Sequence, residues 1–182
     1  MDHLERLKSE LSEEISPRER SDPSHTDLSK AVLNEFSQQV EEILKAWNLP
    51  GTNRVYFDET AIDFVIDGKP RGSRGKGLRA ITYASVLIAL MEYCIGHGLP
   101  HPGFVVLDSP LLAYWEPEGK EDDLQGTDVN DRFYAYLMSK HSDSQVIIIE
   151  NEHPPEAYTK GISLTVFTKN PHQGRYGFFP FE

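Results

Sequence analysis

Cysteine is nearly absent from the sequence, in which Cys94 is the only one among 182 residues. A lone cysteine cannot form an internal disulfide, and Cys94 has no basic neighbour to activate its thiol, so we expect a buried structural residue. Long apolar runs are also lacking. Residues 1–5 lack the apolar core of a secretory signal, and the most apolar stretch, residues 81–91, is too short to cross a bilayer. We therefore expect a cytoplasmic protein with no membrane partner.

Positive charge is scarce as well, because 18 lysines and arginines stand against 29 acidic residues, which gives a formal net charge of -11. This balance excludes a general electrostatic attraction to nucleic acid. Five of the cations nevertheless fall in one short segment: Lys69, Arg71, Arg74, Lys76 and Arg79. The cluster predicts an anion-binding surface, with a solvated basic loop as the simpler alternative.

A Walker A motif is missing too. That phosphate-binding loop has the pattern Gly-x-x-x-x-Gly-Lys-Ser/Thr, whereas here Lys76 is followed by Gly77 and no other segment supplies the pattern. The chain should therefore lack the lysine that holds the β- and γ-phosphates in P-loop ATPases. We do not expect it to hydrolyse ATP alone.

The first positive feature of the sequence is a helical periodicity of apolar residues near its start. Four apolar residues recur at helical spacing near the start: Leu4, Leu7, Leu11 and Ile15. This spacing is typical of a narrow-faced helix or the stub of a coiled coil. Residues 17–25 are rich in Ser, Pro, Arg and Asp, which indicates a flexible break. We thus divide the chain into a helical extension, residues 1–25, and a globular domain, residues 26–182.

Hydrophobic periodicity predicts the elements of the globular domain. Helices are expected over residues 27–47, 78–95 and 128–140, and strands over residues 54–57, 63–66, 103–107, 145–149, 162–168 and 175–179. Residues 111–127, rich in acids with proline and glycine, predict a long surface loop. The strands at 103–107 and 145–149 are continuous apolar runs, which is typical of strands covered on both faces. The sequence therefore predicts an α/β fold with a mostly parallel central sheet flanked by helices.

Two local patterns point to nucleotide chemistry. Gly72-Ser73-Arg74-Gly75-Lys76-Gly77 opens an apolar helix, and the exposed amides at a helix start attract phosphate. Asp108 ends the apolar strand at 103–107, where a carboxylate can hold Mg²⁺. A cap for the following turn is the alternative role for Asp108.

These residues resemble a known family. Ser73-Arg74-Gly75-Lys76 looks like the ABC-type signature motif, and residues 104–108 look like the Walker B strand of Rad50- and SMC-like ATPases. The order of elements over residues 51–182 is similar to the C-terminal lobe of that ATPase head. The resemblance implies ATP and Mg²⁺ as cofactors, with Ser73, Arg74, Gly75 and Lys76 binding the γ-phosphate of ATP on the opposite head and Asp108 holding the metal.

The resemblance also implies partners and a pathway. The missing Walker A lobe would come from another polypeptide or a full-length homologue, in a dimer of heads that contacts DNA through the assembled complex. Members of the family act in DNA repair, chromosome maintenance or anti-phage defence.

The chain departs from the family pattern at the catalytic positions. Ser109 stands where the family has the glutamate that orients water, and serine is a poor general base. Glu150, at the end of the strand 145–149, is our candidate replacement, with the loop acids Glu116 and Glu118 as alternatives. Asn151 takes the position of the family's switch histidine and is assigned to the nucleotide.

Two other functions stay open. In the first, the chain keeps the fold as a non-hydrolytic interaction module that associates with nucleotide or DNA. Alternatively, several acids assemble a Mg²⁺-dependent nuclease site: Asp108, Glu116, Glu118, Asp122 and Asp123.

Overall fold

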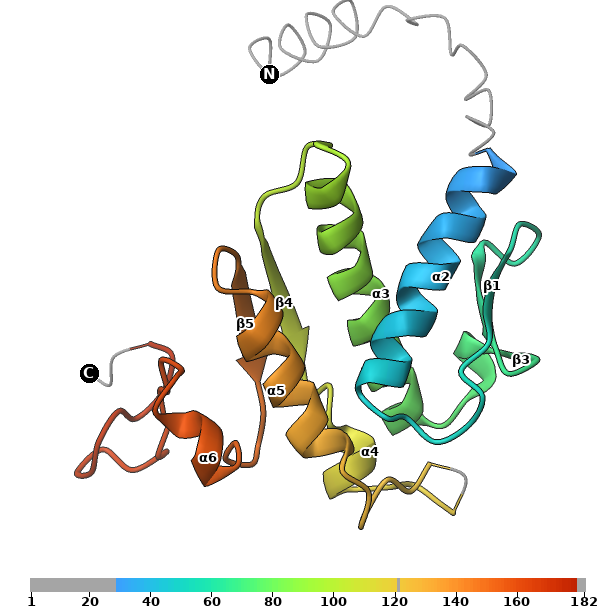
Figure 1. Cartoon of the computed structure of the whole chain (residues 1–182). Coiled ribbons are helices and arrows are strands. Elements are labelled where there is room, and N and C mark those ends of the chain that lie inside the picture. Colours follow the sequence, from blue (N-terminus) through green and yellow to red (C-terminus); the bar gives the residue numbers. More distant parts are fainter. Residues whose placement is uncertain (1–28, 121, 180–182) are drawn as a thin grey trace, which may run out of the picture. The chain divides into compact units, whose positions relative to one another are not determined.

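The computed structural model describes residues 29–120 and 122–179 of the chain (Figure 1). The chain divides into two units, Met1–Leu33 and Asn34–Glu182, and the packing described below concerns the second, which includes all of α2 after Leu33. The predicted helical extension over residues 1–25, with its coiled-coil spacing and flexible break, lies outside the described residues.

The fold is mixed α/β, as predicted. Its elements in chain order are α2 (Lys30–Ala46), β1 (Val55–Asp58), β2 (Asp63–Ile66), β3 (Lys69–Pro70), the short 3-10 helix η1 (Arg71–Ser73), α3 (Lys76–Gly96), β4 (Phe104–Asp108), α4 (Leu112–Trp115), α5 (Val129–Lys140), β5 (Gln145–Ile149) and α6 (Glu156–Thr159). The expected helices and the first four expected strands are thus all present, within a few residues of their predicted bounds.

The hairpin strands form a small antiparallel sheet in the order β1-β2-β3. Asp67 and Gly68 make the two-residue turn between β2 and β3, and both have positive φ, at 51° and 73°. Such a turn suits the right-handed twist of paired strands, and Gly68 adopts it without strain. The turn delivers the chain directly into η1 and the start of α3.

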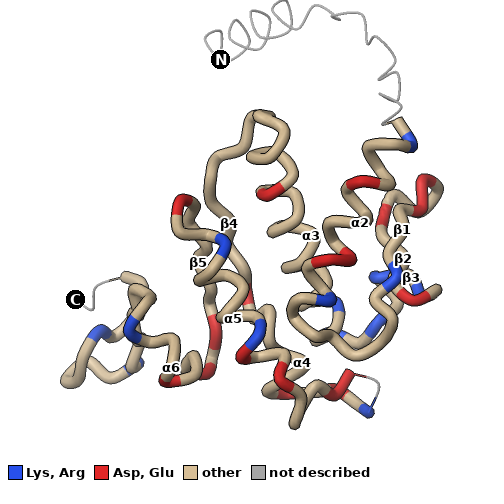
Figure 2. The backbone as a smooth tube through the Cα atoms, in the orientation of Figure 1, with Lys and Arg blue, Asp and Glu red and all other residues tan. Residues whose placement is uncertain are grey.

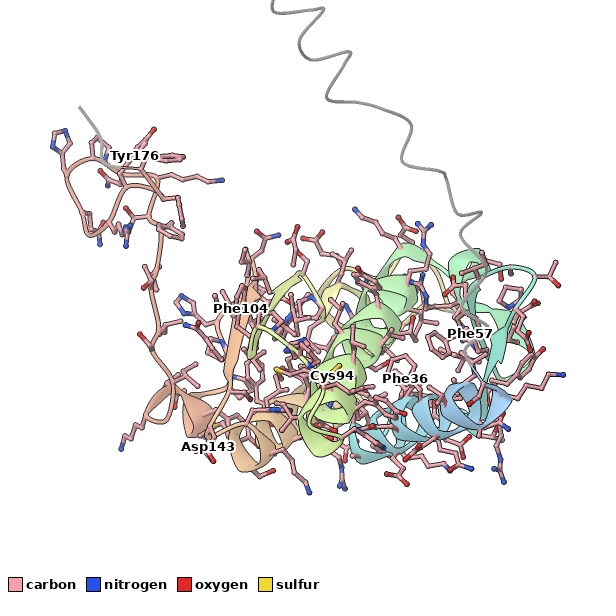
Figure 3. All side chains as sticks on the ribbon, turned by 90° about the horizontal axis from the view of Figure 1, so that it is seen from above. Phe36, Phe57, Cys94, Phe104, Asp143 and Tyr176 are labelled. Carbon is pink, nitrogen blue, oxygen red and sulfur yellow. The ribbon has the colours of Figure 1, made fainter. Side chains whose placement is uncertain are left out.

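The core lies among the apolar faces of α2, α3 and α5. Trp47, which follows α2, is fully buried and meets Phe133 of α5 edge-to-face, with ring centroids 4.9 Å apart. Phe36 and Phe57 both contact Phe64, so that aromatic rings join α2 to the antiparallel sheet (Figure 3). This packing buries the apolar stripes that the helical periodicity predicts.

Helix α3 is the core helix of the unit. Ile81, Ile88 and Met91 are fully buried within it. Among the described helices α3 alone is long and apolar enough, by length and composition, to cross a membrane. The expectation that the apolar stretch at 81–91 is too short to cross a bilayer therefore needs correction, because the helix that contains it has 21 residues. Core helices of soluble proteins share this composition, and the cytoplasmic location stays a prediction.

A polar cluster ties α3 to its neighbours. The carboxylate of Glu92 accepts hydrogen bonds from Gln39 Nε2 of α2 at 3.1 Å and from the Tyr136 hydroxyl of α5 at 2.7 Å. His141 Nε2 lies 3.0 Å from the same carboxylate. Burial tends to raise the pKa of Glu92, but the contacts with His141, Tyr136 and Gln39, of which the one with His141 has the largest effect, lower it below its ordinary value.

Strands β4 and β5 pair in parallel, in a register that places Asp108 opposite Ile149. Val105 and Leu107 of β4 face the core, whereas Phe104 and Val106 are 45% and 46% exposed. The prediction that these strands are covered on both faces is therefore wrong, because apolar side chains on the second face lie open within the described residues. The described parallel sheet has these two strands, and a larger central sheet is not part of it.

Two further predictions need correction. The strands expected at 162–168 and 175–179 are reduced to one isolated bridge between Phe167 and Arg175, beside which the Thr168 amide donates to the Arg175 carbonyl at 2.8 Å. The expected surface loop at 111–127 instead contains helix α4 and buries Leu111 and Leu124. The short helix α6 was not predicted.

Candidate functional site

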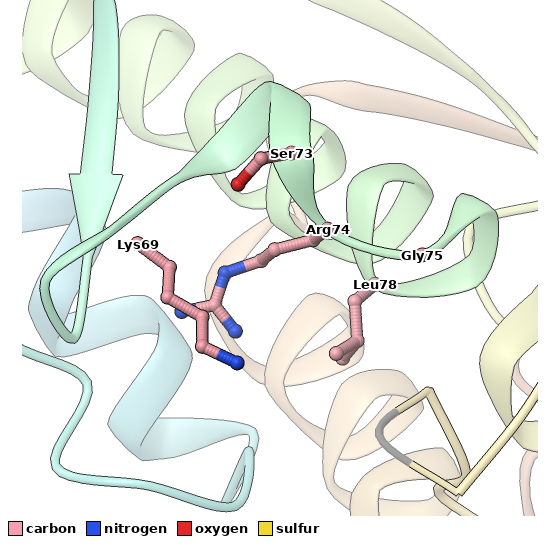
Figure 4. Close-up of a pocket in the computed structure, with 5 residues that line it drawn as sticks. All are labelled: Lys69, Ser73, Arg74, Gly75 and Leu78. Carbon is pink, nitrogen blue, oxygen red and sulfur yellow. The ribbon is translucent and has the colours of Figure 1, made fainter.

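The predicted signature segment lines a pocket at the start of α3. Gly75 is the residue before the first turn of the helix, and the pocket of about 370 Å³ is lined by Lys69, Ser73, Arg74, Gly75 and Leu78. In Figure 4 the cationic ends of Lys69 and Arg74 point into the same space, on the side of the ribbon where Leu78 also lies. Cations at a helix start favour an anionic ligand.

Hydrogen bonds fix the pocket walls. The Ser73 hydroxyl donates to the Pro70 carbonyl at 2.8 Å, and Arg74 donates from Nη2 to the Ile66 carbonyl. Arg74 Nε is shielded from solvent and has no hydrogen-bond partner among the described residues. Burial tends to raise the pKa of the Asp67 carboxyl, but hydrogen bonds and the nearby Arg74 guanidinium lower it. The pocket therefore holds a cation with unused donor capacity.

The backbone amides of α3 already have partners. Asp122 accepts from the Gly77 amide at 3.0 Å and from the Leu78 amide at 2.7 Å, and Glu118 accepts from the Lys76 amide at 3.2 Å. Figure 2 shows acidic residues around α4 and the segment that follows it, and basic residues along β2 and β3. The amides predicted to meet phosphate are thus capped by carboxylates of the same chain, with Asp122 only 3% exposed.

Two glycines permit these contacts. A β-carbon at Gly75 would lie 2.6 Å from Cγ of Asp122, so any larger residue would push the carboxylate away. A β-carbon at Gly77 would overlap the backbone of Ala113 in α4. Because only three residues separate the end of β4 at Asp108 from the start of α4 at Leu112, this contact fixes the start of α3 against the end of β4.

The second group of predicted residues lies at the carboxyl ends of β4 and β5. Ser109 takes a left-handed conformation, with φ of 48°, and donates its amide to the Ile149 carbonyl at 2.8 Å. Its hydroxyl donates to Asp108 Oδ1 at 3.0 Å. Glu150 and Asn151 follow directly after β5, so Asp108 and Glu150 belong to neighbouring strand ends.

The electrostatics of this strand end raise the pKa of Glu150 above its ordinary value. Its carboxylate accepts from the Leu111 amide at 2.8 Å. Burial is the largest cause acting on the Glu150 pKa, and the charge of Asp108 adds to it, so the pKa is raised despite the hydrogen bonds it accepts. Burial, together with the nearby negative charge of Glu150, raises the pKa of Tyr134 to about 12. A raised carboxyl pKa is common where a side chain moves protons.

The described residues contain no cluster of three or more His, Cys, Asp or Glu side chains arranged to hold a metal. Asp108 supplies one carboxylate at this strand end, and Mg²⁺ at nucleotide sites often takes one or two carboxylates with phosphate and water completing the shell. A metal held there would need those further ligands from a nucleotide and water. Two acids of the nuclease alternative, Glu118 and Asp122, instead accept hydrogen bonds from the first amides of α3.

The structure therefore brings the predicted residues together in two groups. Ser73, Arg74, Gly75 and Lys76 stand at the start of α3, while Asp108, Glu150 and Asn151 stand at the strand ends. Asp122 was not singled out for the first group, although a helix that is preceded by glycine and has no acid in its first turn leaves amides in need of a partner.

Comparison of the chain with protein-family models and with curated proteins finds no match.

Proposed function

We propose that this chain is the C-terminal lobe of a Rad50/SMC-like ATPase head, which contributes a signature segment and a Walker B carboxylate to ATP sites completed by another polypeptide. Asp108 is proposed to hold Mg²⁺, and Glu150 to act as the base that accepts a proton from water. Ser73, Arg74, Gly75, Lys76 and Asn151 are proposed to meet the phosphates. The sequence resemblance suggests the family, and the geometry below supports the assignment of residues.

The observation that carries the proposal is the pairing of Asp108 and Glu150. Ligands of open α/β sheets bind at the carboxyl ends of parallel strands, and these two carboxyls end adjacent strands of one parallel pair. A base needs a pKa closer to neutrality than that of an ordinary carboxylate, and the raised pKa of Glu150 is in that direction. Glu150 thereby offers a replacement for the glutamate absent at Ser109.

The open sheet supports the part of the proposal that concerns a partner. One face of β4 and β5 exposes Phe104, Val106, Ile147 and Ile149 to solvent. A parallel sheet is normally covered on both faces. We infer that the mostly parallel central sheet is completed when the Walker A lobe adds its own strands and covering elements.

The test mixes the purified chain with a Walker A polypeptide, chosen as the product of a neighbouring reading frame that carries Gly-x-x-x-x-Gly-Lys-Ser/Thr. We expect no ATP hydrolysis by the chain alone and Mg²⁺-dependent hydrolysis by the mixture. Asp108→Ala should abolish turnover, whereas the exposed acid Asp143, changed to Ala, should leave it intact. Ser73→Arg should also abolish turnover, with Ser142→Arg as its control. Turnover that survives both site changes would reject the assigned roles.

A non-hydrolytic interaction module is the second candidate, and Ser109 favours it. The family's water-orienting glutamate is absent, and the Ser109 hydroxyl instead bonds Asp108. For such a module the mixture binds ATP with Mg²⁺ but yields no phosphate, and Glu150→Gln leaves binding unchanged.

A further inference from the structure

The segment that follows α6, residues 162–179, exposes apolar side chains along its length, and we name it the C-terminal arm. Phe178 and Phe179 are the most exposed, at 73% and 77%. Apolar groups gathered on one exposed segment mark a surface that contacts a partner. Six large apolar side chains of the arm are exposed: Leu164, Val166, Phe167, Tyr176, Phe178 and Phe179.

The beginning of the arm has the pattern of a strand. Ile162, Leu164 and Val166 alternate with Ser163 and Thr165, so the three apolar side chains would share one side of an extended chain. No backbone hydrogen bond joins residues 162–166 to any other residue that the structure describes. This stretch thus has the side chains of a strand without a neighbouring strand to pair with.

The parallel sheet offers a complementary surface on the exposed side of β4 and β5, which we name the open sheet face. Because the described sheet has two strands, each strand also has one edge without a neighbour. An uncovered apolar face and an unpaired edge are the features that an added segment satisfies. The open sheet face carries four apolar side chains: Phe104, Val106, Ile147 and Ile149.

Charge complementarity favours the C-terminal arm as the segment that covers this face. The arm contains Lys169 and Arg175 and no acidic residue, so the net charge of -11 arises entirely outside it. Exposed acids stand at both ends of the open sheet face, because Asp108 ends β4 and Asp143 lies just before β5. A basic and apolar arm therefore matches an apolar face bordered by carboxylates.

The anchor of the arm favours the open sheet face of a second copy over its own. Tyr158 of α6 stacks on Tyr134 of α5, with ring centroids 6.0 Å apart. Helix α5 and the covered side of β4 contribute Phe133 and Val105 to one buried cluster. The arm therefore starts on the covered side of the sheet, and it would have to pass around the sheet edge to reach its own open face.

We propose that the C-terminal arm of each chain covers the open sheet face of a second copy, so that two chains exchange arms in a symmetric dimer. Residues 162–168 reach about 23 Å when extended, which is enough to follow a strand of five residues, about 17 Å long. Exchange of one identical element between two copies is a common route to a two-fold dimer, and it makes each contact twice. The inference goes beyond the proposed function and does not depend on it, because it concerns the chain before a Walker A lobe takes the same face.

Sedimentation equilibrium of the full chain over a range of concentrations tests the exchange. We expect an equilibrium between monomer and dimer with a Kd on the order of micromolar. Leu164→Asp in the arm and Ile147→Asp on the open sheet face should each raise this Kd by about tenfold or more, because the dimer would bury an unpaired carboxylate.

Two matched controls carry the same added charge elsewhere. Thr165→Asp lies on the other side of the arm's strand pattern, and Ile62→Asp replaces an exposed apolar residue in the turn between β1 and β2. Both controls should dimerise as the wild type does. Circular dichroism below the Kd shows whether each variant folds, and Val106→Asp replaces Ile147→Asp if the latter does not.

A mixture of the two site variants separates arm exchange from other kinds of dimer. Leu164→Asp keeps an intact open sheet face, and Ile147→Asp keeps an intact arm. One of the two arm contacts can therefore form between them, so the mixture should associate more tightly than either variant alone.

Three results would overturn the inference. The first is a wild-type chain that stays monomeric up to about 100 µM, as an arm folded on its own sheet would give. The second is a dimer that persists unchanged in either site variant, and the third is a mixture that associates no more tightly than its components. ATP hydrolysis with the Walker A polypeptide has no part in these measurements, so the dimer and the proposed function can fail separately.

Discussion

Replacing Gly77 with alanine should destabilise the protein, although alanine is the better helix former. Gly77 is the second residue of α3, and a β-carbon at this position would overlap Cα, N and Cβ of Ala113. Backbone atoms cannot rotate aside as the end of a flexible side chain can. Helix α4 would have to shift, and with it the segment that leaves β4 after Asp108.

Two opposing effects set the magnitude. Alanine gains up to about 1 kcal/mol over glycine in a helix interior, and less near a helix end. Overpacking a close contact costs about 1–3 kcal/mol, and a backbone neighbour places this case in the upper half of that range. The net loss should be about 1–2 kcal/mol, which for a chain of this size lowers the Tm by roughly 2–8 °C.

Urea unfolding, followed by the fluorescence of the two tryptophans, Trp47 and Trp115, measures this loss. The matched control is Gly96→Ala in the last turn of the same helix, where a β-carbon would meet no atom within 4 Å. We expect this control to be as stable as the wild type or more stable. If Gly77→Ala proves no less stable than the wild type, the close approach of α3 to α4 is wrong, and so is the link between the two groups of site residues.

Three other predictions concern charge and the open sheet. Because the folded protein lowers the pKa of Glu92, this carboxylate stabilises the fold at a pH above its unfolded pKa, and the stabilisation is lost as the pH falls through the folded pKa. Glu92→Gln should lower the free energy of unfolding by about 2 kcal/mol at pH 7 and should make that free energy depend less on pH in the acid range. Glu150 has a raised pKa, so as the pH is lowered, ATP hydrolysis by the mixture with the Walker A polypeptide should begin to decline at a higher pH than it would with an ordinary carboxylate as base. A pH-rate profile in which the rate falls only near pH 4 would contradict a base at this position. Val106→Asp on the open sheet face should leave the free energy of unfolding within about 0.5 kcal/mol of the wild type, whereas Val105→Asp on the core face should unfold the chain, as circular dichroism would show.

The spacing of apolar residues predicted most of the helices and strands, because buried side chains recur at regular intervals along these elements. The stripe of α2, the apolar length of α3 and the hairpin turn at Asp67 and Gly68 each depend on residues close in sequence. The adjacency of Asp108 and Glu150 could also be predicted, since consecutive parallel strands joined by a helix place their carboxyl ends together. These features need no information about distant contacts.

The rest depends on contacts that no local pattern encodes. Val105 and Val106 are the same residue type on opposite faces of β4, so the sequence cannot show which face is covered. Asp122 lies among several acids, and its burial against the start of α3 follows only from the way α4 packs on Gly77. Residues 162–168 have a strand pattern without a partner strand, and pattern alone does not supply the missing hydrogen bonds.

During synthesis, α3 emerges well before the residue that caps its first turn, because Gly77 and Asp122 lie far apart in the sequence. Asp122 is made 45 residues after the amide that it caps, which at 5–20 residues per second is roughly 2–9 seconds of translation. During that interval the Gly77 and Leu78 amides lack the carboxylate that caps them, and a product truncated before residue 122 never gains it.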